Sequence, residues 1–352
     1  MDGLTIVTGG AGFIGSHLVE QLAAEGRRVR VIERPGASVE HLPGEVEIAR
    51  ADIRDAQQVR NAMRGGTHVF HLAANPNLWV RDRREFDAVN HRGTVHVLDA
   101  AIAEGAERIV HVSTESILTC ARRVGPIAED VEVTEADAVG PYCLSKLRAE
   151  QAARDRAEAG YPILIANPTM PVGPGDRGLS PPSRLIRDYA RGKIPAILDC
   201  TLNLIDVRDT AEGLRRILDR GRVGRRYLLG GTNLTLRSLF ERLSALTGVP
   251  VPRRRVPYPV ALGYAFFSEF WADRMTGNSP QATVTGVRLT RRTMHFDATR
   301  SLAELDLRVR PVEQSLFDAV AWLRRGDNPS EHHAEANSKT FIFPLASGSR
   351  PA

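Results

Sequence analysis

Short apolar segments alternate with longer amphipathic segments along the first half of the chain. The apolar segments are continuous, as in strands buried on both faces of a parallel sheet. Six strands are expected, at residues 4–7, 29–32, 46–49, 68–72, 108–112 and 163–167. Helices are expected at residues 13–25, 56–63, 86–104 and 142–159. This alternation predicts an α/β fold, a doubly wound parallel sheet with helices on both faces.

The pattern changes after Asn167. Residues 167–176 are rich in proline and glycine and are expected to form an irregular loop. Helices follow near 183–191, 209–219, 235–247, 258–274 and 312–324, with short strands near 226–229 and 251–256. We therefore expect a first domain over 1–170, a smaller mixed α/β substrate lobe over 171–325, partly interleaved with the sheet, and a loose polar tail over 326–352.

Composition excludes several classes of protein. The 352 residues are 42% hydrophobic and 25% charged, which is ordinary for a globular chain and unlike disordered, collagenous or coiled-coil chains. No apolar run reaches about 18 residues and no signal-peptide pattern opens the chain, so neither a spanning helix nor secretion is expected. Cys120, Cys143 and Cys200 form no CxxC pair and no zinc-ligand spacing, which favours reduced thiols in the cytoplasm and no metal.

The net charge of +5 points to no nucleic-acid partner. Only three of the 47 basic residues are lysines, and the arginines are scattered without a nucleic-acid-binding motif. Attraction to acidic substrates or to anionic lipid surfaces stays open.

The first strand leads into a glycine-rich turn, TGGAGFIG, at residues 8–15. Gly9 permits the tight turn, Gly12 lets the backbone approach a pyrophosphate, and Gly15 lets helix and strand pack closely. The N-terminus of the following helix offers unpaired N–H groups and a positive dipole to phosphates. Glu33, at the end of the next strand, is placed to accept hydrogen bonds from the adenosine ribose. The turn therefore predicts a Rossmann-type dinucleotide site.

The choice between NAD and NADP rests on two neighbouring residues. Glu33 favours NAD because a carboxylate repels a 2′-phosphate, whereas Arg34 would pair with that phosphate. We favour NAD and keep NADP open. Asp52 and Ile53 follow the third strand, where Asp52 would reach the adenine amino group; its alternative is a helix cap, a role that suits Asp55 better.

Tyr142 and Lys146 stand four residues apart, on one face of a helix that begins after Pro141. A free tyrosine has a pKa near 10, too high for a base at neutral pH. A nearby ammonium and a positive nicotinamide ring would lower it, so that Tyr142 exchanges a proton with a substrate hydroxyl during hydride transfer. Lys146 would also bind the nicotinamide ribose. The alternative is a solvated lysine on an exposed helix face.

These motifs resemble the extended short-chain dehydrogenase/reductase family, which includes the NAD-dependent epimerases and dehydratases. The matching segments are TGGAGFIG at 8–15, HLAA at 71–74, VNHRGT with Asn90, VST at 112–114, YCLSK at 142–146 and NPTMPVGPGD at 167–176. The resemblance covers about residues 1–325. Segments 202–213, 227–236 and 286–316 are most similar to the branch of dihydroflavonol reductases and 3β-hydroxysteroid dehydrogenases, and within it to bacterial hopanoid-associated sugar epimerases.

The resemblance implies further site residues. Thr114 would bind the substrate oxygen beside Tyr142, and Asn90 would support the active-site geometry, its alternative being an ordinary helix cap. Phe13 and Ile14 would line the pyrophosphate, and Pro168 would meet the nicotinamide amide. Leu72, Ala73 and Ala74 would pass under the adenine side of the cofactor, although they are core residues at a strand end in any reading.

Residues 115 and 116 bear on the reaction type. Family dehydratases carry Thr-Asp-Glu where this chain has Thr114-Glu115-Ser116, so one acid is retained and the second is absent. Classical 4,6-dehydration is therefore not expected. Glu115 is interpreted as a substrate contact or as a solvated acid at the strand end, and Ser116 and Asn167 as further candidate substrate contacts.

An aromatic segment distinguishes the second lobe. Residues 256–273 hold six of the chain's 20 aromatic residues. They are expected to form a helix packed on the sheet; the alternatives are an apolar wall for a hydrophobic substrate or a face on a membrane surface. Trp79 is expected to border the substrate cleft, because it follows the fourth strand.

We therefore expect an NAD(P)-dependent enzyme that acts on a secondary alcohol or ketone of a hydrophobic polycyclic, isoprenoid-type or lipid-linked sugar substrate. A nucleotide-sugar 4-epimerase, with Arg184, Arg187 and Arg208 as candidate diphosphate ligands, is the alternative. A non-catalytic NAD(P)-sensing scaffold is an alternative of another class. The family suggests a homodimer formed through the helices at 86–104 and 142–159, and peripheral membrane contact stays open.

Overall fold

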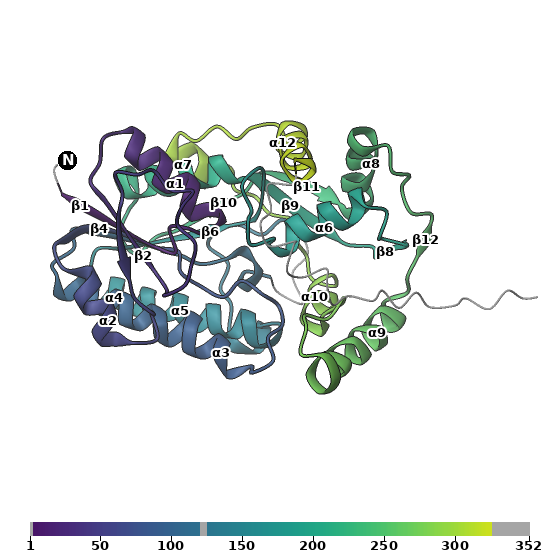
Figure 1. Cartoon of the computed structure of the whole chain (residues 1–352), viewed down its shortest axis with the longest axis horizontal. Helices are drawn as coiled ribbons and strands as arrows, with labels where there is room; N and C mark the ends of the chain where they lie inside the picture. The colour runs from purple at the N-terminus through teal and green to yellow at the C-terminus, as the bar shows by residue number, and fades with distance from the viewer. Residues whose placement is uncertain (1–2, 120–124, 326–352) are drawn as a thin grey trace, which may run out of the picture.

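A seven-stranded parallel sheet forms the centre of the molecule in the computed structural model, which describes residues 3–119 and 125–325 (Figure 1). Its order is β10-β6-β5-β4-β1-β2-β3, and every neighbouring pair is parallel. The strands are β1 (Leu4–Thr8), β2 (Val29–Glu33), β3 (Glu47–Arg50), β4 (Gly66–His71), β5 (Arg108–Val112), β6 (Ile163–Pro168) and β10 (Arg226–Leu229). The doubly wound sheet expected from the sequence is confirmed.

Helices cover both faces of this sheet (Figure 1). Helices α1 (Phe13–Ala24) and α7 (Val207–Arg220) pack on one face, and α2 (Ala56–Met63), α4 (Gly93–Ala103) and α5 (Gly140–Glu158) on the other. Two apolar clusters, one on each side of the sheet, account for the core, because each face buries the apolar stripe of its helices. The side chain of Asp55 caps α2 by accepting from the backbone of Gln57 and Gln58, as expected.

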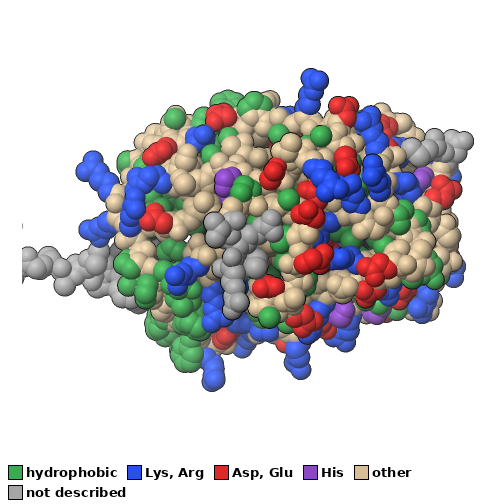
Figure 2. All heavy atoms as spheres, turned by 180° about the vertical axis from the view of Figure 1, so that it is seen from behind, with side chains coloured by type: hydrophobic (Ala, Val, Ile, Leu, Met, Phe, Trp, Pro, Cys, Tyr) green, Lys and Arg blue, Asp and Glu red, His purple; other side chains and the backbone are tan. Residues whose placement is uncertain are grey.

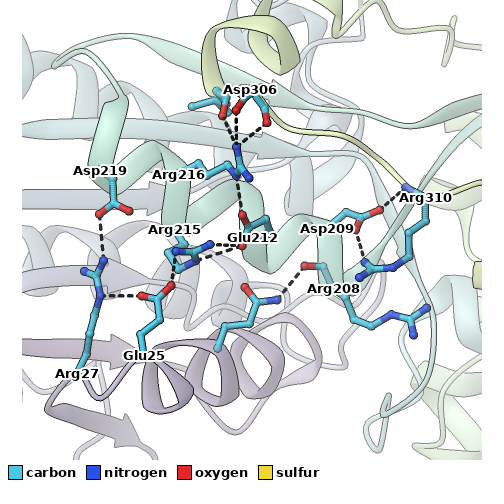
Figure 3. Close-up of polar contacts among 12 residues, drawn as sticks. Glu25, Arg27, Arg208, Asp209, Glu212, Arg215, Arg216, Asp219, Asp306 and Arg310 are labelled. Atoms are coloured by element: carbon cyan, nitrogen blue, oxygen red, sulfur yellow. Dashed lines mark hydrogen bonds and ion pairs between the residues drawn. The ribbon is translucent and has the colours of Figure 1, made fainter.

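Ion pairs cross the outer surface between α1 and α7 (Figure 3). Arg27 donates to Glu25 at 3.0 Å and to Asp219 at 3.1 Å. Glu212 binds both Arg215 and Arg216 on its own helix. Partly exposed pairs of this kind each contribute about 0–1 kcal/mol, so the apolar cluster beneath them does most to hold α7 on the sheet.

The helix expected at residues 86–104 is not continuous. It divides into α3 (Arg84–Phe86), a π-helical segment η1 (Asp87–Arg92) and α4. A π-helical turn inserts an extra residue into the helix and changes the direction of the side chains within it. Asn90 is not a helix cap, because it lies inside η1, whose N-cap is Phe86. Its side chain is fully buried.

The second lobe contains a three-stranded sheet of order β11-β9-β7, formed by β7 (Met170–Val172), β9 (Thr201–Asp206) and β11 (Thr232–Thr235). Helices α6 (Pro181–Ala190), α8 (Leu236–Thr247) and α12 (Val312–Arg324) share its apolar core. The prediction that residues 167–176 form an irregular loop was wrong for 167–172, since β6 extends to Pro168 and β7 follows, whereas residues 173–176 lie in no strand or helix. Pro171 is tolerated because β7 is an edge strand.

The rest of the lobe is made of short elements. Strands β8 (Ala196–Ile197) and β12 (Arg254–Arg255) pair in parallel, so the strand expected at 251–256 shrinks to two residues. Helices α9 (Tyr258–Trp271), α10 (Val284–Leu289) and α11 (Thr299–Leu305), the π-helical η4 (Ala272–Thr276) and the 3-10 turns η2 (Glu115–Ile117) and η3 (Glu135–Asp137) complete the structure.

Helix α9 does not pack on the sheet. It packs against α10 and leads into η4, and most of its large apolar side chains are exposed, so the expectation of a buried helix was wrong. The return of β10 to the main sheet confirms that the second lobe is partly interleaved with it. The bounds 1–170 and 171–325 stay a prediction. The tail at 326–352 and Cys120 lie outside the described residues.

Candidate functional site

The glycine turn between β1 and α1 leaves no room for a side chain at Gly9 or Gly15. Gly9 has φ of +70°, and a Cβ atom there would lie 2.8 Å from the backbone of Ala73. A Cβ atom on Gly15 would lie 2.2 Å from the carbonyl oxygen of Gly9. The structure thus gives Gly9 and Gly15 the steric roles that the sequence predicted, the tight turn and the close helix–strand contact.

Among residues 3–119 and 125–325, no side chain caps the N-terminus of α1. Gly12 is the N-cap residue and supplies no side-chain cap, and the first turn, which holds Phe13 and Ile14, contains no acidic residue. The N–H groups and the positive end of the helix dipole are therefore available to an anion. This cradle fits the pyrophosphate of a dinucleotide.

The adenosine side of the cradle is held by Glu33. Its Oε1 accepts from the backbone N–H of Ala11 at 3.0 Å, which places the carboxylate against the glycine turn, while Arg34 is exposed. Asp52 is bound by the guanidinium of Arg54, and this contact lowers the pKa of Asp52. Ile53 is buried against α4. The candidate adenosine contacts are Glu33, Arg34, Asp52 and Ile53. Of these, Glu33 is the one that hydrogen-bonds the glycine turn.

The end of β4 lies beside the same turn. Leu72 N–H donates to the Thr8 carbonyl at 3.1 Å, and Ala73 N–H to the Thr8 hydroxyl at 3.2 Å. Leu72, Ala73 and the following Ala74 are partly exposed. This stretch therefore keeps both readings that the sequence allowed, a cofactor wall and a strand end.

A buried polar cluster lies just after β5. The Thr114 hydroxyl is 2.9 Å from Glu115 Oε2 and 2.8 Å from Ser116 Oγ. Glu115 is 7% exposed, so the reading of a solvated acid was wrong. Burial raises the pKa of Glu115 to about 7, because a carboxylate loses its hydration there. Near neutral pH this acid is therefore divided between its protonated and charged forms.

Tyr142 faces this cluster from α5. Hydrogen bonds with the Thr114 and Ser116 hydroxyls favour its ionised form, but burial and the charge of Glu115 dominate and raise the pKa of Tyr142 well above its usual value. The lowered pKa that we expected from Lys146 is not found in the protein by itself. Tyr142 is thus a protonated phenol, a form suited to giving a proton.

Lys146 lies one turn further along α5 and is also buried. Its Nζ donates to the Val112 carbonyl at 2.8 Å, at the end of β5. Burial lowers the pKa of Lys146 to about 8, and the charge of Glu150 partly offsets this. The alternative of a solvated lysine was wrong.

Two residues that sequence reasoning missed, Glu150 and Arg226, support this arrangement. Arg226 Nη2 lies 2.6 Å from Glu150 Oε1, and both side chains are buried. Asn167 Nδ2 donates to Glu150 Oε2 at 2.8 Å and to the Thr114 carbonyl at 3.1 Å, and Pro168, the next residue, is buried at the end of β6. The i, i+4 spacing of Lys146 and Glu150 was a signal available in the sequence.

Asn90 connects α5 with the loop after β4. Its Oδ1 accepts from Asn75 N–H at 2.7 Å, and its Nδ2 donates to the Asn75 carbonyl at 3.2 Å and to Ser145 Oγ at 3.1 Å. Ser145 in turn donates to the Tyr142 carbonyl at 2.8 Å. Asn90 therefore holds both backbone segments without touching the Tyr142 phenol.

The loop after β4 and helix α10 complete the surroundings of Tyr142. Leu289 of α10 shares an apolar cluster with Tyr142, Phe86 and Cys143. Trp79 is 8% exposed, with the Arg83 guanidinium 5.2 Å from its ring centroid, and its Nε1–H has no partner among the described residues. These contacts place apolar surface next to the polar cluster.

A cavity of about 620 Å³ lies in the second lobe. Its basic lining residues are Arg237, Arg255, Arg291, Arg292 and His295. The three arginines proposed from sequence are not among the residues that line it: Arg184 donates to Asn77, Arg187 binds Asp188, and Arg208 binds Asp206 and Asp318. The basic surface of the lobe therefore lies elsewhere than the sequence suggested.

Comparison with known proteins identifies relatives over most of the chain. Residues 5–230 match the NAD dependent epimerase/dehydratase family. A Synechocystis protein provisionally named dihydroflavonol 4-reductase is 34% identical over 325 residues, covering 90% of this chain and 94% of its own. Sterol demethylase protein B of Methylococcus capsulatus is 31% identical, covering 91% and 98%. The crystal structure of gox2253 superposes with a TM-score of 0.82 at 33% identity, covering 93% and 99%.

The family match spans more than half of the chain and agrees with the glycine turn and the Tyr142–Lys146 pair that the structure brings to one edge of the sheet. The chain is therefore an NAD-dependent enzyme of the extended short-chain dehydrogenase/reductase type, and it belongs to the NAD-dependent epimerase/dehydratase family.

Proposed function

We propose that this enzyme interconverts a secondary alcohol and its ketone on a hydrophobic polycyclic or isoprenoid-type substrate, or on the sugar of such a lipid. The observation that carries the proposal is the buried cluster at the carboxyl end of β5. There the protonated phenol of Tyr142 meets the hydroxyls of Thr114 and Ser116, and Thr114 also contacts Glu115. Lys146 lies one helical turn away.

Bound NAD would lie with its pyrophosphate on Gly12 and the α1 N-terminus and its adenosine ribose on Glu33. When bound, it supplies hydride to a ketone in its reduced form and accepts hydride from an alcohol in its oxidised form. Thr114 binds the substrate oxygen, and Tyr142 gives that oxygen its proton in the reducing direction. Because burial raises the pKa of Tyr142, the phenol holds the proton that the reducing direction requires.

In the oxidising direction Tyr142 has to act as a base. The ammonium of Lys146 and the positive ring of oxidised NAD would stabilise the phenolate that results. A protonated Glu115 removes the negative charge that opposes it. Glu115 also accepts from Thr114, so it orients the hydroxyl that binds the substrate oxygen. Asn90 keeps the loop after β4 and the start of α5 in register with each other.

The substrate class is inferred from relatives and from the surroundings of Tyr142. The two relatives reported above are named for a flavonoid and a sterol, both multi-ring molecules. Leu289 and Phe86 provide apolar surface near Tyr142, and the Nε1–H of Trp79, which has no partner among the described residues, offers a donor to a single polar group. A polycyclic isoprenoid of the hopanoid kind satisfies both features.

A nucleotide-sugar 4-epimerase is the second candidate. The specific observation in its favour is the basic cavity of the second lobe, where Arg237, Arg255, Arg291 and Arg292 would suit a diphosphate. In this case hydride leaves and returns to opposite faces of the same carbon, with the same Tyr142 chemistry. The intact Thr114, Tyr142 and Lys146 argue against a non-catalytic sensor.

We further propose a cytoplasmic homodimer that pairs through α4 and α5, which the family suggests. Peripheral contact with a membrane would bring such an enzyme to an apolar substrate. Among the described residues no helix has both the length and the hydrophobicity to cross a bilayer.

The two candidate functions separate in one set of assays. Purified enzyme is given reduced NAD with polycyclic ketones, oxidised NAD with polycyclic alcohols, and UDP-galactose or UDP-glucose alone, and products are identified by mass spectrometry. Cofactor turnover with a polycyclic substrate supports the oxidoreductase, and interconversion of the sugars without net cofactor change supports the epimerase. Tyr142→Phe should abolish either activity, whereas Tyr161→Phe, which alters an exposed tyrosine, should leave it intact.

A further inference from the structure

Helix α9 turns its large apolar side chains away from the protein. Only its small residues Ala261 and Ala265 are buried. The exposed side chains, from 39% to 61% accessible, are Val260, Tyr264, Phe266, Phe267, Phe270 and Trp271. At about 100° per residue these six positions fall within an arc of about 160° on one side of the helix. We call these residues the α9 patch; Figure 2 shows green side chains gathered where α9 reaches the surface.

An exposed apolar patch on this scale marks a contact with another molecule rather than ordinary surface. The patch is not a loose end of the fold, because α9 is anchored from behind. Glu269 accepts from Val284 N–H at 2.8 Å, and Asp273 pairs with Arg83 at 3.1 Å. The helix is therefore held in place while its aromatic face stays uncovered by the described residues.

The charge around the α9 patch is strongly positive. Residues 253–292 contain seven arginines and two acidic residues. Both acids, Glu269 and Asp273, contact Arg83, which belongs to the loop after β4, so one of their two negative charges is offset there. Arg255 pairs with Asp199 at 3.0 Å and Arg292 donates to the Asp137 carbonyl, whereas Arg274 and Arg288 lie beside the rings of the patch.

These arginines border the aromatic rings. The Arg274 guanidinium lies 6.0 Å from the Phe270 ring centroid, and that of Arg288 lies 5.9 Å from the Phe266 ring centroid. The exposed run of residues 253–255, three consecutive arginines, precedes the helix. Arginine stems that lie along apolar rings while their charged ends reach outward are suited to a surface that is apolar inside and anionic at its boundary.

We propose that the α9 patch docks onto an anionic lipid bilayer, with α9 lying in the plane of the membrane interface. The aromatic face would enter the boundary between headgroups and acyl chains, and the surrounding arginines would pair with lipid phosphates. Trp271 and Tyr264 fit this depth because both carry an apolar ring with a polar atom at its edge.

A second copy of the chain is a poorer occupant for the patch. A two-fold contact places identical surfaces against each other, so the arginines around one patch would face those around its mate. This like-charge repulsion opposes association, whereas lipid phosphates neutralise the same charges. Charge complementarity therefore favours the bilayer.

Docking would bring the membrane close to the catalytic cluster. Arg83 contacts α9 through Asp273 and stacks over Trp79, and Leu289 of the neighbouring α10 packs with Tyr142. Helix α10 thus packs against α9 and also contributes Leu289 to the apolar cluster of Tyr142. The docking itself does not depend on which substrate Tyr142 serves.

Trp271 provides a direct probe of insertion. The full-length enzyme is mixed with phosphatidylcholine vesicles in which about one lipid in three is, or is not, replaced by anionic phosphatidylglycerol. The acyl chains of the vesicles carry bromine as a contact quencher. We expect a blue shift and quenching of tryptophan emission only with the anionic vesicles. The effect should disappear in Trp271→Phe and persist in Trp322→Phe, which alters a tryptophan on α12.

Vesicle sedimentation tests the two components of the patch separately. Phe266→Ser/Phe270→Ser should weaken binding by about tenfold or more, because two rings are no longer inserted. Arg253→Gln/Arg274→Gln should weaken it at low salt and reduce its salt dependence. Phe317→Ser, which alters an exposed phenylalanine on α12, should bind as the wild type does. Thermal unfolding and NAD binding of each variant verify that the fold is intact.

Four outcomes would overturn the proposal. They are an absence of binding to anionic vesicles, binding that survives Phe266→Ser/Phe270→Ser, self-association in light scattering that this double variant abolishes, and Trp271 emission that is already blue-shifted in buffer at every protein concentration. The third would assign the α9 patch to a second copy of the chain, and the fourth to another part of the same chain. None of them bears on the activity assays with Tyr142→Phe.

Discussion

The buried ion pair between Glu150 and Arg226 holds the catalytic cluster from behind, and its loss has a calculable cost. Glu150 is 1% exposed and Arg226 is 9% exposed. Oε1 of Glu150 accepts from Arg226 Nε at 2.8 Å and Nη2 at 2.6 Å, while Oε2 accepts from Asn167 Nδ2 at 2.8 Å. Both carboxylate oxygens are therefore used, and the same Asn167 amide reaches the Thr114 carbonyl.

Glu150→Gln cannot reproduce these contacts. A glutamine has one acceptor oxygen, so if that oxygen faces Arg226, its NH2 group faces the Asn167 NH2 group, donor against donor. The substitution also leaves the Arg226 guanidinium buried without a counter-charge. Removing one partner of a buried pair costs about 3–5 kcal/mol, so we expect the free energy of unfolding to fall by that amount.

Urea unfolding followed by fluorescence and circular dichroism measures this loss. Glu158→Gln, at the exposed end of the same helix, is the matched control and should change stability by less than about 0.5 kcal/mol. Glu150→Met/Arg226→Met removes both charges and should recover about half or more of the loss. A loss below about 1 kcal/mol in Glu150→Gln, or a double variant less stable than the single one, would refute the reasoning.

The same substitution has an electrostatic signature at Lys146. Burial lowers the pKa of Lys146 to about 8, and the charge of Glu150 acts in the opposite direction. Glu150→Gln removes that charge, so the pKa of Lys146 falls further. A lysine is charged below its pKa; the ammonium is therefore lost at a lower pH in the variant, and activity that needs it should decline at a lower pH than in the wild type.

Three further substitutions test the cofactor cradle and the acid cluster. Gly15→Ala should abolish NAD binding in calorimetry, because its Cβ atom would lie 2.2 Å from the Gly9 carbonyl oxygen; near-normal affinity would contradict the packing argument. Glu33→Gln should weaken NAD binding and shift preference toward NADP by about tenfold, a result absent if Glu33 only supports the turn. Glu115→Gln should lower the pKa of Tyr142, since the negative charge that Glu115 carries above its pKa of about 7 raises it. The rise of alcohol oxidation with pH, which follows the ionisation of Tyr142, should then move to lower pH by on the order of one unit. An unchanged pH profile would show that Glu115 takes no part in the proton transfer.

Local sequence signals were enough to predict the central sheet. Each of its first six strands contains β-branched or other apolar residues, and each ends near a turn or helix signal in the neighbouring residues. The residue ranges expected for α2 and α12 agree with the structure, because Asp55 and Pro311 mark their starts. The glycine turn could also be predicted from the sequence, because only glycine fits at positions 9 and 15.

The second lobe was less predictable because its strands are short and pair over long separations. The three-stranded sheet joins β7 to β9 and β9 to β11, and β7 contains a proline that reads as a loop signal. The division of residues 84–103 into α3, η1 and α4 was likewise not predicted, because π-helical segments are rare and occur as short insertions within an otherwise helical pattern. In such segments the secondary structure depends on the strand or helix that packs against them.

By itself the sequence determined the parallel sheet, the pyrophosphate cradle and the placement of Tyr142 and Lys146 on one helix face, because each depends on residues that are close along the chain. Only the tertiary structure decided the protonation of Tyr142, the support that Glu150 and Arg226 give to Thr114, and the exposure of the α9 patch. The physical reason is that burial and charge pairing depend on which distant segments pack together. The same aromatic run could be core or surface, and here its neighbours leave it exposed.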